Sequence, residues 1–274
     1  MGDLKITEIQ PGGSWLRLDL KEIWAYRELL FFLTWRDIKV RYKQTAIGVA
    51  WVILQPVLTT AIFTIIFSNF AQFDTQEVPY SLFALSGLLI WLFVHTSVSM
   101  ASMSFVNNVN LVTKVYFPRL IVPIAATLAS LFDLLFGFIL LLAMMIYFGT
   151  APTLNVFAAP IFVGLAVMLA IAFGTLFSAL NVRFRDVKFA LPFLLQVWFI
   201  ASPIFFPLTI LPENWKPVFA INPLVGILHG FRSALFGTPF DWNMIAISTT
   251  SVLVLLIVSF AIFKRLEDEF ADTI

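Results

Sequence analysis

Residues 134–182 read LLFGFILLLAMMIYFGTAPTLNVFAAPIFVGLAVMLAIAFGTLFSALNV and contain no charged side chain. This stretch is more than twice the roughly 20 apolar residues that one helix needs to cross a bilayer. Near its middle lies Gly149-Thr150-Ala151-Pro152, and Gly and Pro at this spacing favour a turn. The stretch therefore predicts two consecutive membrane-spanning segments, the second near Val156–Leu180.

Similar apolar segments recur along the chain and predict about six spans in all. The others are Ala46–Phe73, Tyr80–Met103, Leu120–Phe148, a segment that begins at Phe189, and Met244–Phe263. Only 12% of the residues are charged and 60% are hydrophobic, whereas about a quarter are charged in soluble domains. We therefore expect an all-α integral membrane protein.

The cations are distributed very unevenly about these spans. Fifteen of the 17 Lys and Arg residues fall on one side of the predicted membrane, and only Lys216 and Arg232 fall on the other. The positive-inside rule then places both termini in the cytoplasm. No sustained apolar run precedes Ile47, so we do not expect a cleaved signal peptide.

Before the first span, residues 21–43 have a different character. Trp24, Phe31, Trp35, Ile38 and Tyr42 recur at near-helical spacing, with cations mostly elsewhere around the helix. This pattern predicts an amphipathic helix at the cytoplasmic interface, and an irregular basic tail is the alternative.

The segment Pro203–Trp242 stays apolar but contains six prolines, which exclude one continuous helix. We expect broken, re-entrant helices rather than a plain external loop. The predicted organisation is a cytoplasmic N-terminus (1–45), a six-helix transmembrane domain (46–263, re-entrant at about 203–242) and a cytoplasmic tail (264–274).

The sequence contains no motif that indicates catalysis. It lacks a phosphate-binding loop G-x-x-x-x-G-K-[ST], a G-x-S-x-G elbow and an H-E-x-x-H zinc motif. It has no cysteine, and its two histidines are far apart, so we expect neither a metal nor a cofactor on this chain. The net charge of +1 gives no indication of a nucleic-acid partner.

Asp133 interrupts the third span. Counted from Leu120, it lies roughly 20 Å into a core about 30 Å thick. A charge at that depth should face protein or a water-filled path, and the spans contain no second acid or base to pair with it.

Several motifs resemble those of one transporter family, in the same order along the chain. They are Trp35–Thr45 (WRDIKVRYKQT) with Ile47-Gly48, Trp51 and Gln55-Pro56, then Asn110–Pro118 (NLVTKVYFP), Asn181–Val187 (NVRFRDV), Ser202-Pro203-Ile204 and Asn222-Pro223-Leu224. They resemble the transmembrane permeases of ABC exporters, of the ABC-2 type, that move lipid-linked polysaccharides such as O-antigens, capsules and teichoic acids.

This resemblance implies a half-transporter in the inner membrane. Two copies would form the channel, and two separate nucleotide-binding subunits would bind ATP and Mg²⁺. An exporter of drugs or simple lipids is the alternative within the superfamily. An intramembrane transferase would need a cluster of catalytic residues, and the sequence does not contain one. A passive channel is an alternative that composition does not exclude.

The resemblance and the charge pattern together suggest three sets of residues. We expect the ATPase to contact the chain at Asp37, Arg41, Lys114 and Tyr116. We expect lipid headgroups and the charged head of the substrate to meet Arg36, Lys39, Arg41 and Lys43. The candidate substrate-pathway residues are Trp51, Phe63, Asp133, Phe193 and Trp198.

Overall fold

A computed structural model describes residues 20–43, 48, 50–70, 78–210 and 212–267. Within these ranges the chain is helical and contains no β-strand. The rest of the predicted N-terminal segment (1–19 and 44–45) and most of the predicted tail (268–274) lie outside the described residues.

Among the described residues, five helical segments are long and apolar enough to cross a membrane, which confirms an all-α membrane protein. They are α3 (Ala50–Phe70), α4 (Tyr80–Ser102), α7 with α8 (Ile121–Ala129 and Leu131–Tyr147), η1 with α9 (Leu154–Ala158 and Ala159–Arg183), and α13 (Trp242–Glu267). The segment predicted to begin at Phe189 is α10 (Val187–Ile200), a helix of 14 residues. It rises only about 21 Å, so the sixth crossing stays a prediction.

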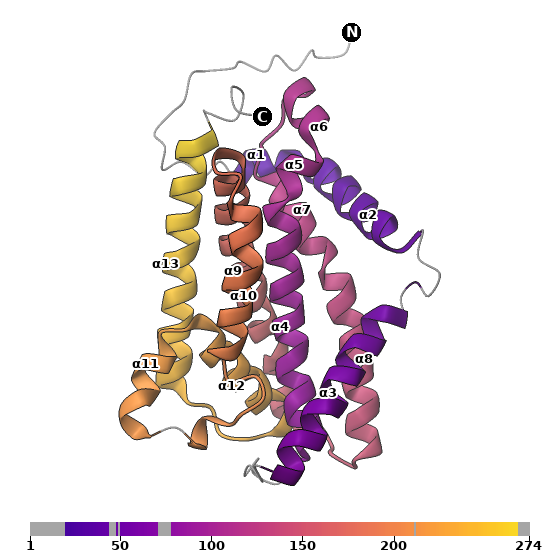
Figure 1. Cartoon of the computed structure of the whole chain (residues 1–274), viewed down its shortest axis with the longest axis vertical. Coiled ribbons are helices and arrows are strands. Elements are labelled where there is room, and N and C mark those ends of the chain that lie inside the picture. The colour runs from indigo at the N-terminus through magenta and orange to yellow at the C-terminus, as the bar shows by residue number, and fades with distance from the viewer. Residues whose placement is uncertain (1–19, 44–47, 49, 71–77, 211, 268–274) are drawn as a thin grey trace.

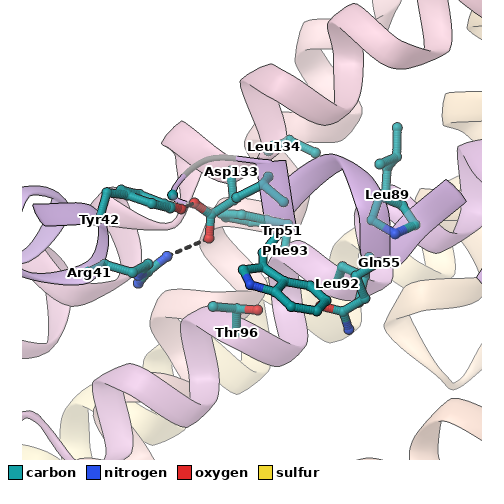
Figure 2. A pocket seen from close by; sticks show the side chains of 13 residues that line it. Arg41, Tyr42, Trp51, Gln55, Leu89, Leu92, Phe93, Thr96, Asp133 and Leu134 are labelled. Carbon is teal, nitrogen blue, oxygen red and sulfur yellow. Dashed lines mark hydrogen bonds and ion pairs between the residues drawn. The ribbon is translucent and has the colours of Figure 1, made fainter. Parts of the chain in front are cut away.

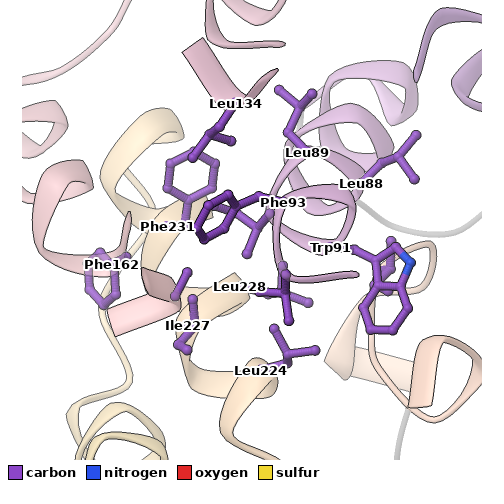
Figure 3. Packing of buried hydrophobic residues seen from close by; sticks show 14 of the residues in the cluster. Leu88, Leu89, Trp91, Phe93, Leu134, Phe162, Leu224, Ile227, Leu228 and Phe231 are labelled. Carbon is purple, nitrogen blue, oxygen red and sulfur yellow. The ribbon is translucent and has the colours of Figure 1, made fainter. Parts of the chain in front are cut away.

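Helix α4 lies at the centre of the bundle (Figure 1) and packs against α3, α7, α8, α9 and α12. Its side chains are buried on nearly every side, from Leu82 to Val98. Phe93 and Leu89 meet Leu134 of α8 and Phe231 of α12 in the main core, which Figure 3 shows. A helix that is apolar all round needs neighbours all round, and this core supplies them.

The N-terminal segment forms α1 (Leu20–Ala25) and α2 (Arg27–Lys43). This corrects the alternative of an irregular tail for residues 20–43. Helix α2 runs obliquely beside α7 (Figure 1) and has two apolar faces. Leu33 is buried against the bundle with Leu29 and Leu30 beside it, whereas Phe31 and Trp35 are exposed.

The proline-rich region forms short helices at the end of the molecule opposite α1 and α6 (Figure 1). They are η2 (Leu208–Ile210), η3 (Glu213–Trp215), α11 (Lys216–Ala220) and α12 (Pro223–Phe236). The Asn222 side chain accepts a hydrogen bond from the Leu224 N–H and so caps α12, and Gly237 ends it at φ 75°. Because α12 is buried along most of its length, a plain external loop is excluded here.

Candidate functional site

The last turn of α2 meets the first turn of α8 through an ion pair (Figure 2). Arg41 Nη1 donates to Asp133 Oδ2, and the Tyr42 hydroxyl donates to Oδ1 of the same carboxylate. Arg41 Nη2 also lies 3.5 Å from Ser130 Oγ. Burial, reinforced by the hydrogen bond to Asp133, raises the pKa of Tyr42 to about 12. The phenol therefore keeps the proton that it donates.

This pair corrects the expectation that Asp133 has no partner. The partner is 92 positions earlier, on a helix outside the long spans, where a search confined to the spans does not reach. The side chains of Arg41 and Asp133 are 18% and 21% exposed, so both charges are largely withdrawn from water. Removing one of them leaves the other uncompensated, at a cost of about 3 kcal/mol.

A cavity of about 300 Å³ lies beside the ion pair, between α2, α3, α4 and α8 (Figure 2). The Trp51 indole, the Gln55 amide, the Thr96 hydroxyl and the Asp133 carboxylate line its wall. Its volume is within the range of small-molecule sites, which combine apolar surface with a few polar groups. A flat ring beside donors and acceptors suits a ligand that has C–H faces and hydroxyl groups, such as a sugar.

Three further cations in the second half of α2 lie in different settings. Arg36 forms an ion pair with its neighbour Asp37 at 2.7 Å. The Lys39 ammonium lies 5.4 Å from the centre of the Trp35 ring, and Lys43 is exposed at the end of the helix. The exposed positive charge of α2 thus comes from Lys39 and Lys43, together with Arg27 at the start of the helix.

The predicted ATPase contact at residues 107–118 combines exposed side chains with others that are buried in the bundle. It includes the end of α5 (Ser104–Asn107) and all of α6 (Val109–Lys114). Lys114 and Tyr116 project from the end of the bundle, and Tyr116 is 63% exposed. Val112 and Phe117 are buried in a second core cluster that also contains Leu33 of α2. A force on this segment would therefore reach α2 through shared packing.

The four predicted pathway rings divide into two pairs. Trp51 and Phe193 are 53% and 66% exposed, and Trp51 lines the cavity. Phe63 instead stacks on Phe205, with centroids 3.5 Å apart. Trp198 donates its indole N–H to Asn222 Oδ1 at 2.9 Å and packs against its own chain. The structure does not bring the four rings together, and their place in a pathway stays a prediction.

Sequence reasoning missed Tyr42, Gln55 and Thr96 as members of the cavity wall. Tyr42 and Gln55 lie in motifs that resemble those of the transporter family, and this was the only sequence signal that marked them. No sequence signal marked Thr96. His95 is half-buried, with its ring 5.9 Å from that of Trp91. Among the described residues, no three His, Asp or Glu side chains are grouped closely enough to hold a metal ion.

The long apolar helices define an integral membrane protein, and a cavity lies among them. Residues 28–236 match the family described as ABC-2 type transporter, and the chain belongs to this family. It is therefore a transmembrane permease subunit, and ATP hydrolysis resides on a separate ABC ATPase partner.

Individual relatives match over almost their whole length. The chain is 29% identical to an O-antigen export system permease protein RfbA of Myxococcus xanthus, over 93% of this chain and 98% of the relative. It is 28% identical to an RfbA permease of Klebsiella pneumoniae, over 89% and 94% of the two chains. A polysialic acid transport protein KpsM of Escherichia coli is 24% identical, over 85% and 91%.

Proposed function

We propose that this chain is the transmembrane half-subunit of an ATP-driven exporter that moves lipid-linked polysaccharide outward across the inner membrane. The observation that carries the proposal is the end-to-end similarity to permeases named for O-antigen export, with a polysialic acid transporter among the relatives. The cavity beside Trp51 and Asp133 adds a wall of the kind that a sugar needs.

The orientation follows from charge. The exposed cations Lys114, Arg185 and Lys188 lie at the end of the bundle that holds α1 and α6, whereas Lys216, at the start of α11, lies at the other end. The positive-inside rule supports placing the first end in the cytoplasm. There the exposed lysines of α2, Lys39 and Lys43, attract the charged head of the substrate, at about 1 kcal/mol per cation.

The assembly is a two-fold homodimer with two ATPase subunits, which bind ATP and Mg²⁺. Helices α3 and α10 both pack on α4, and each leaves a broad apolar face exposed. Ile62 and Ile65 of α3 and Phe193 and Ile200 of α10 lie on these faces. A channel lined by both helices forms when α3 of one copy meets α10 of the other, since an isologous pairing is the commonest closed arrangement.

The polymer then moves by contacts that do not distinguish one repeat from the next. Exposed rings such as Trp51 and Phe193 offer apolar surface to the C–H faces of sugars. Each contact must be weak, because tight binding of one repeat would stall the following one. The ATPase contributes the direction of movement through the segment at residues 107–118.

The test is reconstitution of this chain with its ATPase in proteoliposomes. Lipid-linked O-antigen or capsular polysaccharide should stimulate ATP hydrolysis and appear on the far side. The carrier lipid without sugar, and a panel of hydrophobic drugs, should do neither. Transport of the bare lipids or drugs, with none of the polymer, would overturn the substrate assignment and leave the family membership intact.

A further inference from the structure

The side chain of Arg232 is buried in α12, at the end of the bundle opposite α1 and α6. Its Nη1 donates to the Pro203 carbonyl at 2.8 Å, and its Nη2 donates to the Phe83 and Ile204 carbonyls at 3.1 and 2.6 Å. Its Nε donates to Ser86 Oγ at 3.4 Å. Four of the five guanidinium N–H groups thus donate hydrogen bonds, and the second N–H of Nη1 donates none of these.

Every one of these acceptors is neutral. Among the described residues, no carboxylate forms an ion pair with Arg232, and besides these acceptors its guanidinium carbon lies 3.6 Å from the centre of the Phe83 ring. Buried charges in proteins are ordinarily paired with a charge of opposite sign, because desolvation is costly. The carbonyls hold the guanidinium in place but do not neutralise it.

Arg232 also lines a cavity of about 190 Å³ between α12, the proline-rich segment and the start of α13. Lys216 and His229 are the other basic residues of its wall, and Thr209 and Thr238 add hydroxyl groups. His229 Nε2 accepts the Asp241 N–H at 3.2 Å, so in the neutral imidazole the proton is on Nδ1, which can donate to a ligand.

One acidic residue, Asp241, belongs to the same wall. Its Oδ1 accepts the Met244 N–H at 3.1 Å, at the start of α13, where a carboxylate is favourable. Beside this one carboxylate, the described wall carries the Lys216 ammonium and the Arg232 guanidinium. The wall is therefore rich in hydrogen-bond donors.

We propose that this cavity binds a phosphate-bearing anion at the outer end of the permease. A phosphate or diphosphate group fits the volume, presents acceptors to three basic residues, and supplies the counter-charge that Arg232 lacks. The group can come from a lipid headgroup of the outer leaflet or from a soluble phosphate. The inference rests on the cavity alone and not on the identity of the exported substrate.

The test uses the whole complex in neutral detergent, with its ATPase sites filled by ADP and Mg²⁺. One arm titrates inorganic diphosphate calorimetrically. The other measures, by mass spectrometry, how much phosphatidylglycerol the complex retains. The variant combines Lys216→Gln with His229→Gln and leaves the hydrogen bonds of Arg232 unchanged. The matched control is Lys188→Gln, at the opposite end of the bundle.

We expect the double variant to weaken binding at least 10-fold in one arm and Lys188→Gln to leave it unchanged, since a hydrogen bond to a charged group contributes about 1.5–3 kcal/mol. Loss in the diphosphate arm identifies a soluble ligand, and loss in the lipid arm identifies a headgroup. Equal binding by wild type and double variant in both arms, or no binding in either, overturns the proposal.

Discussion

At the scale of single residues, the ion pair between Arg41 and Asp133 is the contact that joins α2 to the spans. Arg41→Met or Asp133→Asn alone should lower the melting temperature of the purified complex, because each leaves one partner unpaired in a site only about a fifth exposed. The two together should cost less than the sum of the single changes. A double-mutant cycle measures this coupling, and strict additivity would show that the pair contributes nothing.

Two glycines offer a matched comparison of packing. A Cβ on Gly87 would meet Arg232 Nη2 and lie 2.8 Å from the Ile204 carbonyl oxygen, whereas nothing lies within 4 Å of one on Gly164. Gly87→Ala should therefore destabilise the protein by about 1–3 kcal/mol, as overpacking does. Gly164→Ala should be neutral or stabilising, because alanine favours a helix. Melting temperatures measure both, and equal values would contradict the tight contact at Gly87.

Two tryptophans separate a transport role from a packing role. Trp51 is half exposed on the cavity wall, and Trp198 is held by Asn222, Trp91 and Phe173. We expect Trp51→Ala to slow polymer export with little change in melting temperature. Trp198→Ala should lower stability by about 3 kcal/mol, the low end for loss of such a side chain. Export rates normalised to folded protein decide between the roles, and a normal rate for Trp51→Ala removes it from the pathway.

At the scale of elements, the helices were predictable and their contacts were not. Uncharged runs long enough to cross a bilayer locate α3, α4, α9 and α13 because lipid contact imposes that composition. The break at Ser130 between α7 and α8 carries no glycine or proline, so no local signal marks it.

The candidate site was predicted only in part, and for a similar reason. Arg41, Trp51 and Asp133 were each selected separately, and their meeting in one cavity depends on how α2 lies across the bundle. That placement follows from Leu33 and its neighbours packing against α7, which is a long-range contact. Hydrophobic pattern reports which face of a helix is apolar, but not which neighbour will cover it.

The segment at residues 107–118 should transmit force between the ATPase and α2. Replacing Lys114 and Tyr116 by alanine removes exposed groups while the buried anchors Val112 and Phe117 remain, so the permease should stay folded. Export should fall and ATP hydrolysis should continue. Lys188→Ala, exposed at the same end, is the control and should not uncouple. Unchanged export in the double variant would exclude these two side chains from the contact.

At the scale of the whole molecule, the open question is whether α10 crosses the membrane. It rises about 21 Å, short of the roughly 30 Å hydrocarbon core. Two features reduce the difference between the helix length and the thickness of the hydrocarbon core. The buried segment Ser202–Phe205 continues the chain beyond the end of α10, and a bilayer can thin locally around a short helix. Lys188 lies in the first turn of α10 and Asn214 follows that segment, so the two positions bracket this one crossing.

The chain has no cysteine, and each introduced cysteine is therefore the only one. Lys188 and Asn214 are both exposed. In spheroplasts with an intact inner membrane, an impermeant maleimide should label Asn214→Cys at once and Lys188→Cys only after permeabilisation. That result gives α10 a full crossing and, with five longer spans, leaves both termini in the cytoplasm. The reverse pattern would invert the orientation, and labelling of both positions from one side would make α10 a re-entrant helix and leave five crossings.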